Sequence, residues 1–297
     1  MQISFHLVDV FADHPLAGNP LAVVPQADGL DDDDMRSIAR ELHQAETTFL
    51  LSPTRSSADW RLRCFSATGI EVFGAGHNSL GAWWWLAESG LLSLADGQTV
   101  FTQEIGKWLL PVEIYRSAGR LSSVTLTQAA PAYGEVYEDL AALASALGLN
   151  KINFDAALLP AQAVSTGAPH LLVPVKDRAA VEKATPDAAR LTKILGDVRA
   201  QGCYVFSLDT ISPSAIAHAR FFNPTVGIIE DSATGSAAGP LACQLIARGV
   251  ATKNTTITIE QGYEMERPSL LSVSTCGDTV RLSGRCETVA QGTLRVR

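Results

Sequence analysis

The stretch EDSATGSAAGPLA, residues 230–242, places carboxylates, hydroxyl groups and glycines directly before an apolar run. A second stretch, EVFGAGHNSLGAWWWLA, residues 71–87, has the same order of glycine loop and apolar helix. A glycine loop that opens a helix leaves backbone N–H groups without partners at the positive end of the helix dipole. Two such loops facing each other would bind a small carboxylate. The sequence therefore predicts that the two stretches are opposing walls of one active site.

The two stretches belong to a longer internal repeat. Each is followed, at a similar distance, by a strand that carries Gln or Glu and Gly before it turns into another strand: FTQEIGKWLLPVEI and ITIEQGYEMERPSLLSV. Long-range copies of this kind indicate two similar domains that arose by duplication. We place the boundary between residues 118 and 119, giving domains 1–118 and 119–297, with a last strand at about 287–297 that returns to the first domain.

The helix after the first loop predicts how each domain is built. Trp83, Trp84 and Trp85 are consecutive, so on a helix they point in different directions and cannot share one face. A helix that is apolar nearly all round is buried on most sides. The expected fold class is α+β, with two similar domains, each a barrel-like sheet wrapped around a central helix, and an active site in the cleft between them.

Composition restricts the class of protein. Of the 297 residues, 46% are hydrophobic and 18% charged, which is typical of a globular protein. The formal net charge of −8 argues against nucleic acid or an anionic membrane as a partner. No apolar run approaches the length of a membrane span and the first residues do not resemble a signal peptide. Five scattered cysteines fit reduced thiols, so we expect a cytoplasmic protein.

Glu46 and His77 are the first candidates for catalysis. Glu46 begins an apolar strand, where burial would raise its pKa and suit it to transfer a proton; a helix-end cap or a partner for Arg40 is the alternative. His77 lies inside the first glycine loop, where a polar ring is more useful to a ligand than to a core. A single histidine is nevertheless more often structural.

The second loop supplies further candidates and further alternatives. Glu230 and Asp231 precede it, and one of them is a candidate second acid or orienting group. Ordinary helix capping by Ser232 or Thr234 is the alternative for the loop itself. Ser236 has no GxSxG surroundings, which argues against a hydrolase nucleophile.

Other kinds of site receive little support. The loop GAGHNS lacks the third glycine and the N-terminal βαβ context of a dinucleotide site, and no P-loop motif is present. The histidines and cysteines lack metal-ligand spacing, so no metal is expected.

At these residues the sequence resembles the PhzF-like family of phenazine-biosynthesis-type isomerases, which share the diaminopimelate epimerase fold. The resemblance runs nearly from end to end through five ordered blocks: VDVFADHPLAGNPLAVV, AETTFL, GAGHNSLGA, GIIEDSATGSAAGPL and QGYEMERPS. It implies a homodimer that needs no cofactor.

The resemblance also implies roles for individual residues. Glu46 is then the acid/base that shuttles a proton, and His77 and Asp231 are the other catalytic residues. Substrate contacts are implied for Asn19, Gly76, Gly235 and Ser236. Ala45, Asn78–Ser79 and Ser232 depart from the residues common in the family, which bears on substrate identity more than on mechanism. Glycines stand where the epimerase relatives carry two opposed thiols, so two-thiol racemisation does not carry over.

Three hypotheses about function follow. The first is a cofactor-independent isomerase that moves a proton between carbons of a small carboxylate, of the trans-2,3-dihydro-3-hydroxyanthranilate isomerase type. The second is an epimerase or racemase that uses the non-thiol bases Glu46 and Asp231. The third is a protein that binds small carboxylates without catalysis.

Overall fold

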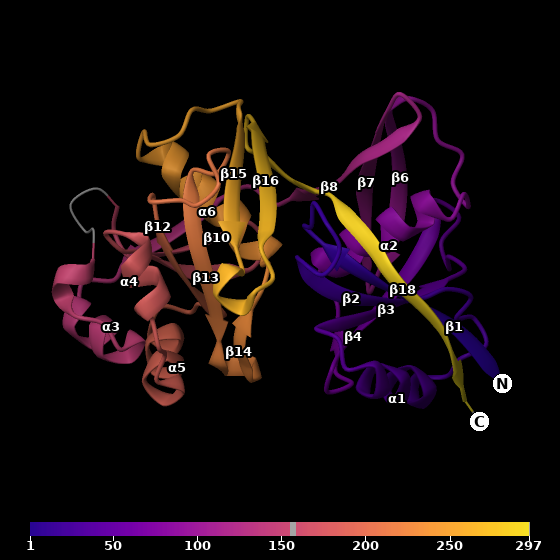
Figure 1. Ribbon diagram of the computed structural model, residues 1–297, viewed down its shortest axis with the longest axis horizontal. Helices are drawn as coiled ribbons and strands as arrows, with labels where there is room; N and C mark the ends of the chain where they lie inside the picture. Colours follow the sequence, from indigo (N-terminus) through magenta and orange to yellow (C-terminus); the bar gives the residue numbers. More distant parts are fainter. Residues whose placement is uncertain (155–158, 297) are drawn as a thin grey trace. The chain divides into compact units, whose positions relative to one another are not determined.

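The structure is a computed structural model that describes residues 1–154 and 159–296 and divides into two compact units (Figure 1). The first unit contains residues 1–127 and the chain from residue 283 onward, and the second contains residues 128–282. The first unit extends past the sequence-based boundary at 118, because strand β8 (Arg120–Gln128) is hydrogen-bonded to β7 (Trp108–Ser117). The last strand, β18 (Cys286–Arg295), pairs antiparallel with β1 (Gln2–Val10) of the first unit.

The first unit wraps strands around one central helix, α2 (Figure 1). Its elements besides β1, β7, β8 and β18 are β2 (Asn19–Val24), α1 (Asp32–Leu42), β3 (Glu46–Leu51), β4 (Trp60–Ser66), β5 (Glu71–Val72), α2 (His77–Glu88) and β6 (Gly97–Ile105). Asp31 caps α1, and its Oδ1 accepts a hydrogen bond of 2.9 Å from the N–H of Asp34.

The second unit wraps its strands around α6. Its strands are β9 (Ala132–Val136), β10 (Gln162–Ser165), β11 (Pro169–Pro174), β12 (Gly202–Ser207), β13 (Ala217–Asn223), β14 (Ile228–Asp231), β15 (Thr256–Gln261), β16 (Ser269–Cys276) and β17 (Thr279–Gly284). Its α-helices are α3 (Leu140–Leu147), α4 (Arg178–Lys183), α5 (Ala188–Asp197) and α6 (Gly235–Ala247), with short 3₁₀ turns at Lys151–Asn153, Pro224–Val226 and Tyr263–Met265.

The two units connect their strands in the same way. In the first, β2 runs parallel to β3, β3 pairs antiparallel with β4, and β4 runs parallel to β6. In the second, β11 runs parallel to β12, β12 pairs antiparallel with β13, and β13 runs parallel to β15. The register also matches, with Arg61 beside Glu104 in one unit and His218 beside Glu260 in the other. This correspondence agrees with the duplication that the sequence indicates.

The central helices are buried on most sides, as the three tryptophans predict. Trp83 is fully buried, and Trp84 and Trp85 are at least nine-tenths buried. The Trp83 indole N–H donates a hydrogen bond of 3.0 Å to Oε1 of Gln103, so its polar atom is satisfied inside the core. In α6, the helix of the second unit, most residues from Gly235 to Leu245 are likewise buried.

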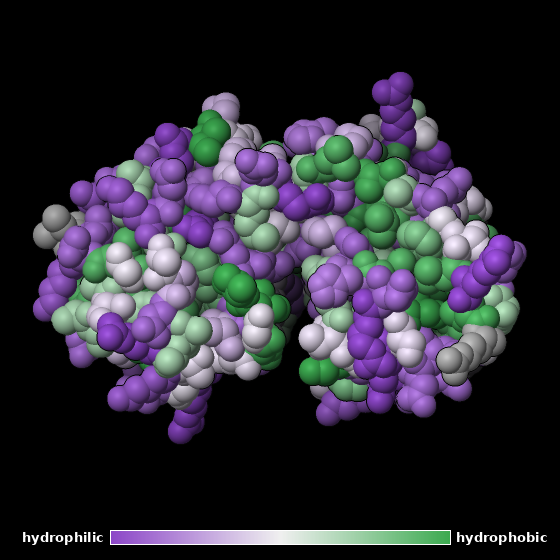
Figure 2. Space-filling model, turned by 60° about the horizontal axis from the view of Figure 1, so that its bottom comes forward, coloured by the Kyte–Doolittle hydropathy of each residue, from purple (hydrophilic) through white to green (hydrophobic). Residues whose placement is uncertain are grey.

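Figure 2 shows hydrophilic residues over much of the visible face of both units, with apolar residues in patches between them. Across the described ranges, no helix combines the length and the apolar character that spanning a bilayer requires.

An arginine–glutamate pair fastens the hairpin that leads into each helix. In the first unit, Nε and Nη2 of Arg63 on β4 donate to the two carboxylate oxygens of Glu71 at 2.7 and 2.9 Å. In the second, Arg220 on β13 donates to both oxygens of Glu230 at 2.8 and 2.7 Å. Bidentate pairs of this kind fix orientation as well as distance. The pairs therefore hold the strands that deliver the two glycine loops.

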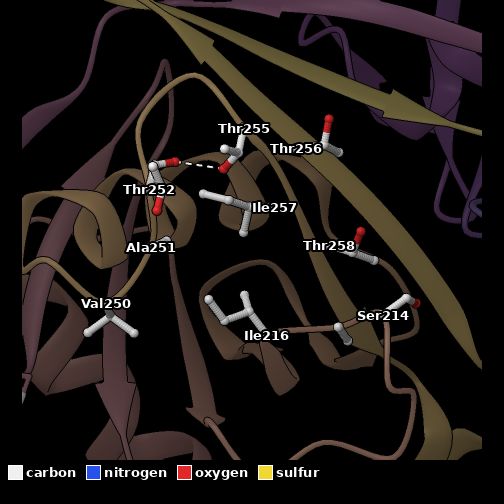
Figure 3. Close-up of a pocket in the computed structure, with 10 residues that line it drawn as sticks. Ser214, Ile216, Val250, Ala251, Thr252, Thr255, Thr256, Ile257 and Thr258 are labelled. Carbon is white, nitrogen blue, oxygen red and sulfur yellow. Dashed lines mark hydrogen bonds between the residues drawn. The ribbon is translucent and has the colours of Figure 1, made fainter.

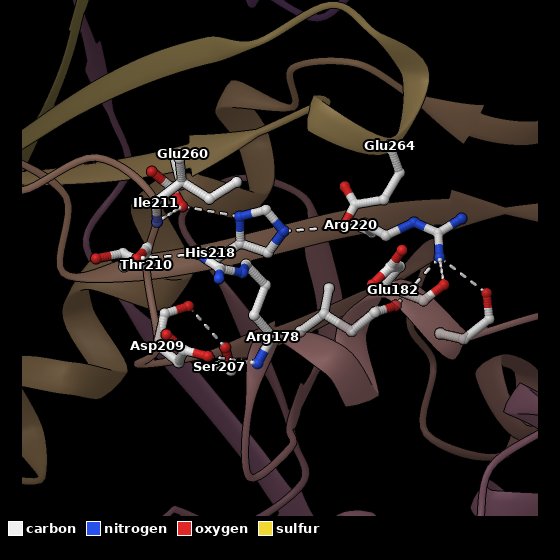
Figure 4. Close-up of polar contacts among 12 residues, drawn as sticks. Arg178, Glu182, Ser207, Asp209, Thr210, Ile211, His218, Arg220, Glu260 and Glu264 are labelled. Carbon is white, nitrogen blue, oxygen red and sulfur yellow. Dashed lines mark hydrogen bonds and ion pairs between the residues drawn. The ribbon is translucent and has the colours of Figure 1, made fainter.

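A buried ion cluster lies beside the second of these pairs (Figure 4). The Nδ1 of His218 lies 2.8 Å from Oε1 of Glu260, and its Nε2 lies 2.8 Å from Oε1 of Glu264. The Glu260 carboxylate also accepts the N–H groups of Ile211 and Ser212 at 2.6 and 2.7 Å. Burial opposes the charge on His218, but the hydrogen bonds to the two glutamates prevail and raise its pKa to about 9.

We expect this cluster to make stability depend on pH. Because the pKa of His218 is raised to about 9 in the folded protein, its contribution is complete below the unfolded value near 6.5. It is lost as the pH rises through 9. Urea unfolding should therefore show a midpoint that falls between pH 6.5 and 9.

The matched variant His218→Gln cannot take up the proton. We expect it to be less stable than the wild type at pH 6.5 and to show a smaller fall in midpoint up to pH 9. Equal slopes for the two proteins across this range would contradict the assignment of the charge to His218.

Candidate active site

The first turn of α2 is organised by the side chain of Asn78. Its Oδ1 accepts the N–H groups of Gly76 and Ser79, both at 2.7 Å, and its Nδ2 donates to the carbonyl of Gly74 at 2.9 Å. The N-cap itself, Gly76, has no side chain to cap the helix. Asn78, a residue inside the helix, thus replaces a capping side chain, and its hydrogen bonds hold the glycine loop against the first turn of α2.

The first turn of α6 is organised by Gln261, which comes from β15. Its Oε1 accepts the N–H of Thr234 at 3.0 Å, and its Nε2 donates to the carbonyl of Asp231 at 2.6 Å. The Tyr204 hydroxyl donates to the same Oε1 at 2.9 Å. Gln261 is fully buried, so these bonds replace water entirely. The loop before α6 therefore depends on a strand that follows the helix.

The side chain of Thr234 does not cap α6, contrary to one of the two capping alternatives. Thr234 is the N-cap residue of α6, but its side chain makes no capping hydrogen bond. Its hydroxyl donates instead to Oδ2 of Asp231 at 2.5 Å. The threonine orients the carboxylate of Asp231, and its oxygen accepts a hydrogen bond of 3.1 Å from Nε2 of Gln261 in place of a helix N–H.

Both helices keep donors for a ligand. At α2, the N–H groups of Gly76, Ser79 and Leu80 have acceptors, whereas those of His77 and Asn78 have none among the described residues. At α6, the N–H groups of Ala237 and Ala238 bond to the carbonyl of Thr234, and those of Gly235 and Ser236 have no acceptor within residues 1–154 and 159–296. Adjacent free donors at a helix N-terminus form a site for anionic oxygen.

Glu46 is the first residue of β3, as the sequence predicts. It is partly buried, and α1 has already ended with His43 as its C-cap, so Glu46 is not a helix cap. Cys64 lies next to it: the charge of Glu46, together with burial, raises the pKa of this thiol. The hydroxyl of Thr48 contacts both Cys64 and the carbonyl of Asn78 at 3.3 Å. Glu46 is therefore near the start of α2.

Asn19 and His77 belong to the same unit as Glu46. Asn19 is the first residue of β2 and is fully buried. His77 is the first residue of α2, and its Nε2 is buried with no hydrogen-bond partner in the part of the chain that the structure describes. Burial lowers the pKa of His77 to about 4, so its ring is neutral at physiological pH.

The choice between Glu230 and Asp231 follows from their contacts. Glu230 is committed to Arg220 through two hydrogen bonds. Asp231, the last residue of β14, adjoins the free donors of α6 and is held by Thr234. Its charge contributes, after burial, to a raised pKa of the Tyr204 hydroxyl. Asp231 is the acid placed at the loop.

Ser236 has a partner that sequence reasoning missed. The Nε2 of His170, on β11, lies 3.0 Å from Oγ of Ser236, and His170 is 3% exposed. No motif marks His170, because its neighbours in the chain form an ordinary apolar strand. Gln261 lies in the block QGYEMERPS, but its bonds to the loop before α6 could not be inferred from that block. Both are recognised only through contacts between segments far apart in the sequence.

The cysteines offer no reactive pair. Cys64, Cys203, Cys243 and Cys286 are buried, and burial raises the pKa of each thiol, that of Cys243 to about 11. A buried thiol with a raised pKa is a poor base at neutral pH. Among the described residues, no group of three His, Cys, Asp or Glu side chains is arranged to hold a metal ion.

One hollow on the second unit lies outside this set of residues (Figure 3). It has a volume of about 300 Å³ and is lined by hydroxyl-bearing and aliphatic side chains without any charge. The lining residues are Ser214, Ala215, Ile216, Val250, Ala251, Thr252, Thr255, Thr256, Ile257 and Thr258. None of the candidate catalytic or binding residues is among them.

Comparison with known proteins identifies the family. The family model for phenazine biosynthesis-like proteins, PhzC-PhzF, matches residues 8–292. The chain belongs to this family. It is 32% identical over 293 residues to the trans-2,3-dihydro-3-hydroxyanthranilate isomerase of Pseudomonas chlororaphis, covering 97% of this chain and 98% of that one.

Solved structures agree with the family assignment. A phenazine biosynthesis protein of the PhzF family from Bacillus anthracis has a TM-score of 0.90 at 26% identity, with both chains fully covered. A predicted epimerase from Pseudomonas aeruginosa has a TM-score of 0.84 at 30% identity, covering 99% of this chain and all of the other. The predicted α+β, epimerase-like fold is thus confirmed, and the protein is an isomerase of the PhzF-like family.

Gln261 provides a test of how the α6 loop is held. Gln261→Leu would remove the hydrogen bonds that Gln261 makes with the N–H of Thr234, the Tyr204 hydroxyl and the Asp231 carbonyl, all in a buried place. Because each buried unsatisfied group costs about 1–3 kcal/mol, we expect urea unfolding to show a loss of at least about 2 kcal/mol.

Gln103→Leu is the matched control. Gln103 is equally buried, but it makes a single hydrogen bond, to Trp83, and belongs to the other unit. A similar loss of stability in both variants would mean that burial of an amide, and not the loop contacts of Gln261, sets the cost.

Proposed function

We propose that this protein is a cofactor-independent isomerase that moves a proton between two carbons of a small carboxylate substrate. The observation that carries the proposal is the repeated pair of uncommitted N–H groups, at His77 and Asn78 in one unit and at Gly235 and Ser236 in the other. Such donors stabilise a carboxylate, and they also stabilise negative charge that develops when a neighbouring carbon loses its proton.

Glu46 is the proposed proton carrier. A carboxylate removes a proton from carbon readily only when the resulting anion is stabilised, which donors at the helix N-termini would supply. The same group then holds the proton and returns it to a second carbon of the same substrate. Family membership supports this role, because the relative from Pseudomonas chlororaphis is named as an isomerase of trans-2,3-dihydro-3-hydroxyanthranilate.

His77 and Asp231 are proposed to assist the transfer. The neutral ring of His77 can donate or accept a hydrogen bond without adding charge. Asp231, oriented by Thr234, is the second carboxylate and would receive or orient a polar hydrogen of the substrate. Asn19, Gly76, Gly235 and Ser236 are proposed to contact the substrate.

An epimerase that uses Glu46 and Asp231 is the second candidate. It is favoured by the presence of a second carboxylate at the start of α6 and by the likeness to a predicted epimerase. The raised pKa values of the buried thiols argue against an epimerase that uses cysteine as its base.

The test is proton NMR of the purified protein with trans-2,3-dihydro-3-hydroxyanthranilate in deuterated buffer. We expect the wild type to convert it to a positional isomer. Glu46→Gln should lower the rate by about 10²–10⁴, the usual contribution of a general acid or base. Glu41→Gln, which removes an exposed carboxylate at the end of α1, is the control and should leave the rate unchanged.

The outcomes separate the candidates. Inversion at one centre, with deuterium incorporated and no positional isomer, would favour the epimerase. Full activity of Glu46→Gln would rule out its assigned role. Binding without turnover in both proteins would leave a protein that binds the compound without catalysis.

A further inference from the structure

The strongest unassigned feature is a buried histidine that adjoins the proposed substrate donors. His170 is the second residue of β11 and lies beside Gly202, the first residue of the parallel strand β12. Its ring meets that of Phe221 edge to face, with centroids 5.0 Å apart. Its Nε2 reaches Oγ of Ser236 at 3.0 Å, and Ser236 is the second residue of α6.

The position of the His170 ring is fixed by packing. A Cβ on Gly202 would lie 2.3 Å from the ring of Phe221, so this position admits only glycine while Phe221 occupies the space. Phe221 is in turn held against Tyr204, with centroids 6.1 Å apart. Gly202 therefore lets Phe221 lie against the His170 ring and keep it turned toward Ser236.

The state of the ring follows from what surrounds it. Burial lowers the pKa of His170 to about 4, so the imidazole is neutral and carries one proton. Its Nδ1 is buried and has no hydrogen-bond partner among the residues that the structure describes. A buried N–H without an acceptor is rarer than a buried acceptor without a donor. The proton therefore belongs on Nε2, where it is donated to Oγ of Ser236.

We propose that His170 is a positioning residue that donates to Ser236 and thereby turns the serine hydroxyl into a donor toward the substrate. With one oxygen lone pair engaged by Nε2–H, the hydroxyl hydrogen of Ser236 stays available to the substrate, at the same helix turn as the N–H groups of Gly235 and Ser236. These three donors favour an anionic oxygen, whereas the carboxylate of Asp231 before the loop accepts a polar hydrogen elsewhere on the substrate. The first turn of α6 therefore takes the carboxylate of the substrate.

The inference rests on the proposed function for its substrate, so it needs a readout that does not require turnover. The first experiment is ¹⁵N NMR of the histidine rings in the whole wild-type protein without substrate. We expect His170 to be neutral from pH 5 to 8 with its proton on Nε2, and its ring signals to shift in Ser236→Ala. A proton on Nδ1, or a charged ring at pH 6, would overturn the inference whatever the activity.

The second experiment measures kinetics with trans-2,3-dihydro-3-hydroxyanthranilate. His170→Phe removes the donor, and we expect KM to rise about tenfold with kcat changed less than threefold, in line with one hydrogen bond to a charged group. His170→Gln keeps an N–H donor on a side chain of similar reach and should restore most of the loss. The double variant His170→Phe with Ser236→Ala should be no worse than Ser236→Ala alone.

Controls separate this role from a structural one. His14→Phe, at an exposed histidine of the first unit, should change neither KM nor kcat. Equal losses in His170→Gln and His170→Phe, or additive effects with Ser236→Ala, would show that the residue acts through packing and would overturn the proposal. If the wild type does not turn the compound over but carries the proton on Nε2, the proposed function fails while the assignment of the donor stands.

Discussion

Burial of the two central helices is the constraint on which the rest of the structure depends. A helix that is apolar on nearly every side must be covered by strands all round, which α2 and α6 achieve in the same topological order. Side-chain burial satisfies the apolar surface, but it does nothing for the N–H groups of the first turn. Each unit must therefore provide acceptors for the first N–H groups of its central helix. The N–H groups that have no acceptor among the described residues form the candidate site.

The two units use different side chains to bind the first N–H groups of their central helices. In the first unit, Asn78 lies within the helix it caps and needs no distant residue. In the second, Gln261 reaches the loop from β15, a strand that follows α6 in the chain. A local solution depends on a few neighbouring residues, whereas the distant one forms only when β15 is in place. Both leave a pair of N–H groups uncommitted, which indicates that the pair, and not the manner of capping, is the feature the two units share.

The sequence predicts what depends on neighbours along the chain. Three consecutive tryptophans were enough to predict the buried helix. Capping by the Thr234 side chain was a reasonable local expectation, but its oxygen accepts a hydrogen bond from Nε2 of Gln261, which comes from a distant strand. His170 and Gln261 were not predicted, because their roles arise from pairing between distant strands. The proposed residues Glu46, His77 and Asp231 came from the loops themselves and from the family resemblance.

The matching strand order of the two units also shows why equivalent positions carry residues of different chemistry. Glu46 and Gly202 are corresponding positions, each the first residue of its strand in the shared topology. A carboxylate cannot stand at Gly202, because any Cβ there would collide with Phe221. That glycine lets Phe221 hold His170, a neutral residue whose hydrogen bond goes to Ser236. At these equivalent positions, the first unit carries Glu46, the proposed acid or base. The second carries Gly202, which makes room for the residues that support the hydroxyl donor of Ser236. The repeat therefore does not place two bases at these equivalent positions, which favours proton transfer by a single carrier.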